Sequence, residues 1–185
     1  MKAPEHLETT RLVLRKPTVA DAEAIYRRYS SDTEVTKYVG WPRHQSIEQT
    51  EEFLTFSEAE WNRWPAGPYL IECQGDRKLL GGTGLAFETP TLAATGYVLA
   101  RDAWGHGYAT EALAAVVVVA RQLGVRRLYA LCHPNHLASI HVLEKCRFVL
   151  EDLLARFADF PNLVSGQRED GLRYAHVFTE DSAAD

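Results

Sequence analysis

The apolar segment from Ala109 to Gly124 is the feature that most restricts how this chain can fold. Val116 to Val119 are four consecutive β-branched residues, which favour a strand, but a segment of about 15 residues is too long for an ordinary strand. Gly124 stands where a helix C-cap is expected. The segment therefore predicts a helix. Because its surface is apolar nearly all round, we expect this helix to be buried on more than one side.

The rest of the chain predicts short strands and further helices in alternation. Thr18 and Asp21 form a capping-box pattern before a first helix over 22–29, and Ser46 with Gln49 begins a second helix that ends near Asn62. Alternating or short apolar runs predict strands at Arg11–Pro17, Tyr69–Cys73, Leu79–Phe87, Thr95–Ala100, Arg127–Cys132, Arg147–Phe157 and Gly171–Phe178, with a last helix at Leu137–Cys146. The order βααβββαβαββ predicts a single α/β (α+β) domain over residues 1–185, in which 179–185 form a charged tail.

Composition excludes several classes of protein. The chain is 46% apolar, which is enough for one core, and its net charge is −5 with scattered Lys and Arg, so we expect no nucleic-acid partner. The longest apolar run, Ala112 to Ala120, is about half of the roughly 20 residues that a membrane-spanning helix needs. The first residues have no apolar signal region, and the three cysteines fit reduced thiols. We therefore expect a soluble, cytoplasmic protein that does not bind a membrane.

Gly105 and Gly107 stand directly before the predicted helix. A helix begins with N–H groups that have no partner in the helix and with a partial positive charge, so an anion fits there. Two glycines allow a phosphate to approach the backbone closely. A bare G-x-G pair is more often a tight turn without a ligand, but the preceding strand and the Thr110 hydroxyl favour a phosphate site. Thr110 replaces the last glycine of a dinucleotide motif, and no Walker-type sequence is present.

Trp104, Gly107 and Ala109 follow the (Gln/Arg)-x-x-Gly-x-(Gly/Ala) pyrophosphate signature of the GNAT acyl-CoA N-acyltransferases, with Trp in the first position. The stretch GYVLARDAWGHGYATEAL resembles the RimJ/RimL-type branch of this superfamily. Further similar stretches are ETTRLVLRKPTVADAEAIY, DTEVTKYVGWP, HPNHLASIHVLEKCRF, FPNL and QREDGLRYA. The resemblance implies a mixed, twisted sheet of about seven strands with about four helices, splayed open between the fourth strand (Thr95–Ala100) and the fifth (Arg127–Cys132).

The resemblance also implies that acetyl-CoA is the cofactor. Its pantetheine arm would lie in the splay and pair with the exposed backbone of the fourth strand from Val98 to Ala100. Its pyrophosphate would lie on the N–H groups from Gly105 to Thr110. The residues expected to contact it are Val98, Leu99, Ala100, Trp104, Gly105, His106, Gly107, Tyr108, Ala109, Thr110, Asn135, His136 and Ser139.

Transfer of an acetyl group to an amine requires a base for the ammonium proton and a proton for the departing thiolate. Glu88, His133 and His136 are the candidate bases, and Ser139 is the candidate donor near the sulfur. The Tyr that many GNAT enzymes use as an acid corresponds to Leu143, and the Glu that often precedes the fourth strand corresponds to Ala94.

Two further departures from the family pattern concern the ends of the last helix. The usual Asn after the fifth strand aligns with His136, which leaves Asn135 one residue early. Arg147 occupies the place of a Gly that ends the helix, so we expect the end of this helix to differ from the family's.

The acceptor is expected to be a primary amine, either a protein N-terminus, an amino acid or another small amine. Trp41, Glu88 and Tyr97 are the residues predicted to bind it, and the net negative charge favours a cationic or small acceptor. An acyl-CoA-binding module without turnover is the main alternative, and a nucleotide-phosphate binder is a second one. We expect a monomer or a homodimer. Cys132, His133, His136 and Cys146 are not expected to bind a metal, since Cys132 and His133 are strand neighbours and point to opposite faces.

Overall fold

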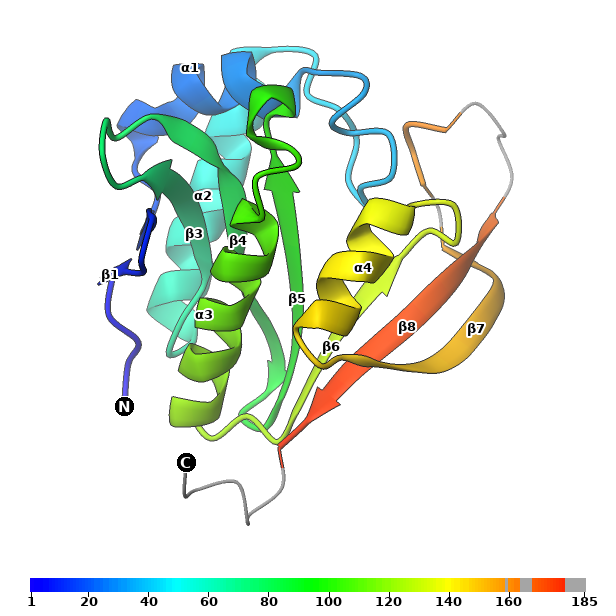
Figure 1. Cartoon of the computed structure of the whole chain (residues 1–185). Helices are drawn as coiled ribbons and strands as arrows, with labels where there is room; N and C mark the ends of the chain where they lie inside the picture. Colours follow the sequence, from blue (N-terminus) through cyan, green and yellow to red (C-terminus); the bar gives the residue numbers. More distant parts are fainter. Residues whose placement is uncertain (159, 164–167, 179–185) are drawn as a thin grey trace.

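An eight-stranded mixed sheet with helices on both faces makes up the protein (Figure 1). The computed structural model describes residues 1–158, 160–163 and 168–178, so the charged tail predicted at 179–185 lies outside it. The strands are β1 (His6–Glu8), β2 (Leu12–Arg15), β3 (Pro68–Cys73), β4 (Leu79–Thr89), β5 (Leu92–Leu99), β6 (Arg127–Cys132), β7 (Val149–Ala158) and β8 (Glu169–Val177). The helices are α1 (Ala22–Ile25), α2 (Ile47–Arg63), α3 (Tyr108–Gln122) and α4 (Leu137–Lys145), with short turns η1 (Val19–Asp21), η2 (Tyr26–Ser30) and η3 (Arg101–Ala103). The sheet order is β1-β2-β3-β4-β5-β6-β8-β7.

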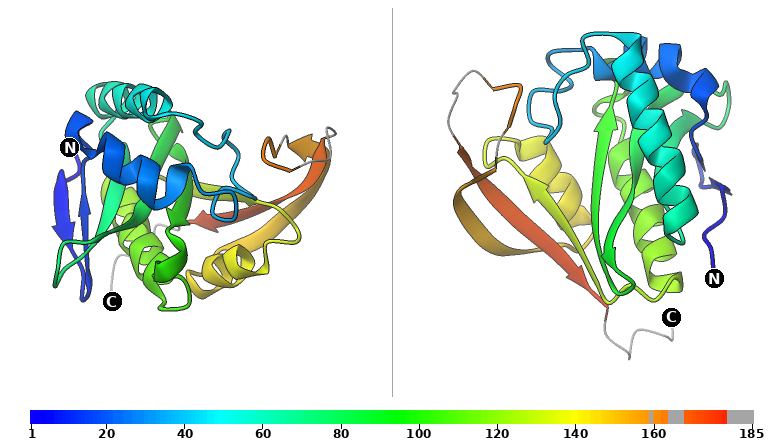
Figure 2. Two further views of the ribbon diagram at one scale, coloured as in Figure 1. Left: turned by 90° about the horizontal axis from the view of Figure 1, so that it is seen from above. Right: turned by 180° about the vertical axis from the view of Figure 1, so that it is seen from behind.

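Helices α1 and α2 cover one face of the sheet, and α3 and α4 lie on the other face (Figure 2). The predicted helix over the valine-rich segment is confirmed as α3. Its residues Ala112, Leu113, Val116 and Ala120 have no exposed surface. This burial explains why a β-branched run is helical here, because packing against the sheet outweighs a propensity difference of less than about 1 kcal/mol per residue.

The splay between the predicted fourth and fifth strands is confirmed. These strands are β5 and β6, which form the one parallel pair among the described strands. Only Leu92–Ala94 of β5 pair with Arg127–Tyr129 of β6, and the two strands diverge beyond these residues. The backbone of β5 after Ala94 therefore has no strand neighbour on its β6 side.

Two elements differ from the sequence prediction. The sheet has eight strands rather than about seven, because His6–Glu8 pairs with β2 at the edge of the sheet. This strand has three residues and no apolar alternation, so nothing in its sequence indicated it. The predicted first helix is present, but after α1 it widens into the single π turn of η2, in which the Ser31 N–H bonds the Tyr26 carbonyl at 3.3 Å.

None of the helices in the described ranges is long and apolar enough to cross a membrane. The three cysteines, Cys73, Cys132 and Cys146, are free thiols.

The end of α4 follows the glycine-type geometry although it carries Arg147, so the expectation of a different end was wrong. Arg147 has φ of 64°, and the N–H groups of Arg147 and Phe148 bond the carbonyls of Glu144 and Leu143, both at 3.0 Å. These two bonds form a Schellman motif, whose left-handed residue is usually Gly. The family geometry is therefore kept here at the cost of backbone strain.

Replacing Arg147 with glycine is expected to stabilise the protein by about 1 kcal/mol, because the left-handed conformation is unstrained for Gly. For a chain of this length the melting temperature should rise by about 2–4 °C. Differential scanning calorimetry measures the change. Arg147→Ala is the control, since it removes the same exposed side chain but keeps the strain, and an equal rise in both variants would contradict the explanation.

Candidate functional site

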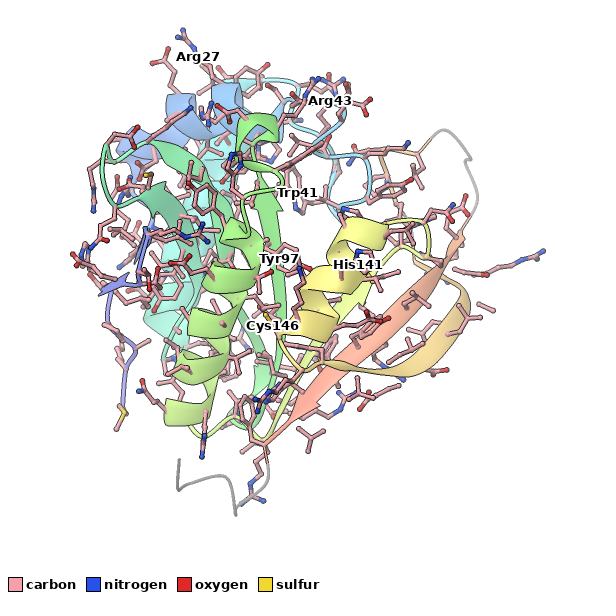
Figure 3. The ribbon with its side chains drawn as sticks, viewed as in Figure 1. Arg27, Trp41, Arg43, Tyr97, His141 and Cys146 are labelled. Atoms are coloured by element: carbon pink, nitrogen blue, oxygen red, sulfur yellow. The ribbon has the colours of Figure 1, made fainter. Side chains whose placement is uncertain are left out.

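The splayed strands border two adjoining cavities. One, the α3 groove, has a volume of about 500 Å³ and lies over the start of α3 and along α4. The other, the loop pocket, has a volume of about 550 Å³ and is bordered by β5, β6, α2 and the loop that carries Trp41. In Figure 3, Tyr97 lies between α3 and α4, with Trp41 above it. Both cavities are lined by Tyr38, Val39, Tyr97, Val98, His136 and Ser139, which we call the junction.

The turn before α3 is built from left-handed glycines. Gly105 has φ of 77° and Gly107 has φ of 78°. The first hydrogen bond of the helix runs from the Glu111 N–H to the Gly107 carbonyl at 3.1 Å. The N–H groups of residues 108–110 therefore have no acceptor within the helix, and these three residues line the α3 groove. A Cβ placed on Gly105 would meet no atom within 4 Å, so the space in front of this backbone is open.

Glu111 holds this turn in place from the side of β2. Its carboxylate accepts hydrogen bonds from the Thr9 hydroxyl at 2.6 Å, the Arg11 backbone N–H at 2.8 Å and the Arg11 Nε at 2.7 Å. Arg11 in turn donates to the His106 carbonyl at 2.9 Å and lies 4.8 Å from the centre of the Tyr108 ring. The turn is thus fixed before any ligand binds, and a guanidinium lies beside it.

Trp104 ties the same turn to β5. Its indole N–H donates to the Leu99 carbonyl at 2.8 Å, which gives a physical role to a residue that stands where the family signature has Gln or Arg. The Ala100 N–H bonds the Leu80 carbonyl at 2.8 Å. These two backbone groups already have partners, so the expectation that a pantetheine arm pairs with them has to be corrected.

Tyr97 and Ser139 meet at the junction. The Tyr97 hydroxyl donates to the Ser139 carbonyl at 3.0 Å and lies 2.9 Å from the Ser139 Oγ. Burial raises the pKa of Tyr97 above its usual value, which keeps this hydroxyl protonated. Ser139 lies in the first turn of α4 and is 9% exposed. The pair is therefore a protonated hydroxyl network at the point where the two cavities join.

His136 is the imidazole that lines both cavities. Burial, and then the nearby His133, lower its pKa below 6.5, so the ring is neutral at pH 7 and can accept a proton. Tyr38 lies between the two histidines, with ring centres 5.0 Å from His136 and 4.9 Å from His133. His133 lines neither cavity, and its Nδ1 accepts the Asn135 N–H at 3.0 Å.

Ten of the residues predicted to contact the cofactor line the α3 groove. They are Val98, Leu99, Trp104, Gly105, Gly107, Tyr108, Ala109, Thr110, His136 and Ser139. Ala100, His106 and Asn135 do not line it: Ala100 is buried, whereas His106 and Asn135 are exposed outside it.

Glu88, predicted as a base and an acceptor contact, lines neither cavity. It is exposed at the end of β4 where β5 and β6 are still paired, and it accepts a hydrogen bond from Tyr129. This position is the closed end of the splay, so Glu88 lies outside both cavities and away from the junction.

Of the other residues predicted for the acceptor, Trp41 and Tyr97 line the loop pocket. Sequence reasoning missed its remaining aromatic wall, formed by Tyr29, Tyr38, Phe53, Phe56 and Tyr69. The first 60 positions hold six aromatic residues, the same 10% share as the whole chain, so composition gave no signal for this wall.

Asn162, in the stretch FPNL, fastens the loop that carries Trp41. Its side-chain amide donates to the Thr36 carbonyl at 2.8 Å and to the Trp41 carbonyl at 2.9 Å, and its oxygen accepts the Arg43 N–H at 2.7 Å. Three hydrogen bonds from the segment between β7 and β8 therefore hold the wall of the loop pocket.

No group of three or more His, Cys, Asp or Glu side chains suited to a metal ion occurs within residues 1–158, 160–163 and 168–178. Burial raises the pKa of the Cys132 thiol to about 11, which disfavours the thiolate that a metal needs.

Comparison with known proteins gives consistent results. A family model described as the acetyltransferase (GNAT) domain matches residues 11–149. The uncharacterized N-acetyltransferase YoaA of Bacillus subtilis is 32% identical over 154 residues, which cover 82% of this chain and 86% of that protein. An acetyltransferase (GNAT family) from Bacillus anthracis has a TM-score of 0.81 at 24% identity, over 93% of this chain and 98% of that one. The ribosomal L7/L12 alpha-N-protein acetyltransferase RimL, solved with coenzyme A, has a TM-score of 0.83 at 24% identity. The match covers 94% of this chain and 98% of that one.

Proposed function

Because this chain belongs to the GNAT acetyltransferase family, we propose that it transfers an acetyl group from acetyl-CoA to a primary amine while both are bound. The observation that carries the proposal is the set of N–H groups at residues 108–110 that have no partner in the helix. These residues line the α3 groove, and this groove shares the junction with the loop pocket. We also propose that residues 1–185 form one acetyltransferase domain. In support, β8 lies beyond the matched residues but pairs along the whole of β6.

The groove fits the cofactor by its chemistry. The N–H groups at 108–110 and the left-handed Gly105 and Gly107 suit a diphosphate, and Lys37 and Lys145 add positive charge along the same groove. Acetyl-CoA, when bound, supplies the acetyl group as a thioester. Val98 and Leu99 line the path from this end of the groove to the junction, where the reacting group has to lie.

His136 is proposed as the base that takes the proton from the ammonium form of the acceptor. It lines both cavities, its ring is neutral at pH 7, and no hydrogen bond ties its side chain to another described residue. Glu88 is not proposed for this role, because it lies at the closed end of the splay.

The Tyr97–Ser139 pair is proposed to hold the proton that a departing thiolate needs. The Tyr97 hydroxyl is protonated, and Ser139 Oγ lies within hydrogen-bond distance of it at the junction. This arrangement replaces the Tyr that many relatives carry at the position of Leu143, which is buried here and has no proton to donate.

Replacing Trp104 with phenylalanine is expected to weaken acetyl-CoA binding about threefold to tenfold, because one hydrogen bond that fixes the turn, worth about 1 kcal/mol, is lost. Isothermal titration calorimetry measures the change. Trp64→Phe is the control, since Trp64 packs on Phe87 and lines neither cavity. Equal affinities of Trp104→Phe and the wild type would contradict the role given to the indole.

The proposed function is tested by measuring free thiol release from acetyl-CoA with a panel of amines, together with calorimetric titration of acetyl-CoA alone. We expect binding in the micromolar range and release that depends on both the protein and an amine. Binding without release for any amine would contradict transfer and would leave an acyl-CoA-binding module. Absence of binding would contradict the cofactor assignment as well.

A further inference from the structure

The two cavities differ in charge. The α3 groove is bordered by Glu34, Lys37 and Lys145, as expected for a site that takes a charged cofactor. In the loop pocket, no carboxylate, ammonium or guanidinium group occurs among the described residues that line it. The negative net charge of the chain is therefore not carried into this pocket, and the expectation that it favours a cationic acceptor has no local basis.

The body of the loop pocket is aromatic and aliphatic. Phe53 and Phe56 come from α2, Tyr29 from η2, and Trp41 from the loop that Asn162 fastens. Ile25, Leu70 and Leu131 complete an apolar lining. A volume of about 550 Å³ is enough to enclose a small aromatic or branched aliphatic group.

The polar groups that face this pocket are neutral. Burial lowers the pKa of His44, whose Nδ1 lies 2.8 Å from the Thr50 Oγ1 and whose ring is therefore uncharged at pH 7. The Tyr29 side chain is 4% exposed, and its hydroxyl makes no hydrogen bond to any residue that the structure describes. This hydroxyl is not one of the fully buried side-chain atoms that lack a partner, so it is accessible from the pocket and can pair with an uncharged polar group of a ligand.

From these observations, and resting on the proposed transferase function, we propose that the acceptor is a primary monoamine whose remaining body is uncharged and aromatic or branched aliphatic. The reacting nitrogen would lie at the junction beside His136, and the apolar body would lie against Phe53, Phe56 and Trp41. Two sources share this chemistry: a free arylalkylamine, and the N-terminal residue of a peptide that begins with an apolar side chain. A polyamine or an aminoglycoside would bring further cations into a pocket that has no counter-charge, which is costly.

The first test compares acceptors with the wild-type protein. The panel contains 2-phenylethylamine, tryptamine, the peptide amide Phe-Ala-Ala, the peptide amide Ser-Ala-Ala, spermidine and kanamycin. We expect kcat/KM for the best aromatic acceptor to exceed that for spermidine and kanamycin by at least about tenfold, because their extra cations stay unpaired. A higher value for phenylethylamine than for the Phe peptide identifies the free amine as the source, and the reverse identifies the peptide. Preference for spermidine, kanamycin or the Ser peptide would overturn the inference while leaving the transferase function intact.

The second test changes the charge of the pocket without disturbing its core. Phe56 is 54% exposed at the mouth of the loop pocket, so Phe56→Asp should fold. We expect kcat/KM for phenylethylamine to fall about tenfold, because an apolar contact is lost. The ratio of kcat/KM for spermidine to kcat/KM for phenylethylamine should therefore rise. Val118→Asp is the matched control, because Val118 is 55% exposed on α3 and lines neither cavity.

The outcomes of the second test separate the two proposals. An unchanged preference in Phe56→Asp, or an equal shift in Val118→Asp, would overturn the acceptor assignment. If acetyl-CoA binds to the wild type and no amine of the panel releases thiol, the transferase function itself fails, and the acceptor assignment fails with it.

Discussion

Replacing Gly105 with valine is expected to raise the Kd for acetyl-CoA about hundredfold. Valine is strongly disfavoured at φ of 77°, so the turn must change its conformation and move the N–H groups of 108–110 away from their present positions. Each hydrogen bond from such a group to a charged phosphate contributes about 1.5–3 kcal/mol, so losing one or two of them accounts for a change of this size. Isothermal titration calorimetry with acetyl-CoA measures it.

The matched control for this variant is Gly124→Val at the other end of α3. Gly124 has φ of 81°, and a Cβ there also meets no atom within 4 Å, so the backbone strain is the same. The melting temperature should fall by a similar amount in both variants, whereas only Gly105→Val should bind acetyl-CoA more weakly. Equal loss of affinity in the two variants would mean that strain in the helix, and not the amides at its start, determines cofactor binding.

Replacing His136 with asparagine is expected to lower kcat about hundredfold or more, the effect of losing a general base. Asparagine is a good N-cap, so the start of α4 should be preserved. The acid limb of the wild-type kcat profile should lie at lower pH than that of an ordinary histidine, because burial lowers the pKa of His136 and the neutral ring is the active form. This acid limb should be absent in His136→Asn. The pH dependence of kcat at saturating amine measures both effects.

His133→Asn is the control for the loss of a ring that stacks on Tyr38. The two histidines lie at nearly equal distances from the Tyr38 ring, but only His136 lines the cavities. We therefore expect His133→Asn to keep most of the wild-type kcat and its acid limb. A fall in kcat as large as that in His136→Asn would contradict the role of His136 as the base and would point to a role for the stack.

The elements that set up the site were predictable because local sequence decides them. The length and composition of 109–124, the glycines before it and Gly124 after it determine α3 and the open turn at its start. The splay between β5 and β6 was predicted from the resemblance to a family and not from any local pattern, because it depends on how far two distant strands pair.

The candidate bases could not be ranked from sequence, because their positions depend on strand register. Glu88 lies within an irregularity in the β4–β5 pairing, between Phe87 and Thr89, at the closed end of the splay. Spacing along the chain does not reveal such a shift. The contact between Tyr97 and Ser139 joins residues 42 positions apart, and only the packing of α4 on the sheet brings them together.

The aromatic wall of the loop pocket was missed for a related reason. Tyr38 lies in the polar stretch between η2 and α2, which forms a loop, and loop side chains follow no periodicity that shows which of them face inward. Trp41, in the same loop, was predicted only from the resemblance to a family. Asn162 and the histidines that stack on Tyr38 hold this loop, and these contacts join residues that are far apart in the sequence.

The central claim, that the amides at the start of α3 bind the diphosphate of the cofactor, is tested most directly by a ¹H–¹⁵N NMR titration. The amide signals of Tyr108, Ala109 and Thr110 should shift on addition of coenzyme A and stay in place on addition of pantetheine, which lacks the diphosphate. If coenzyme A binds while these three signals do not move, or if pantetheine moves them equally, the claim is contradicted.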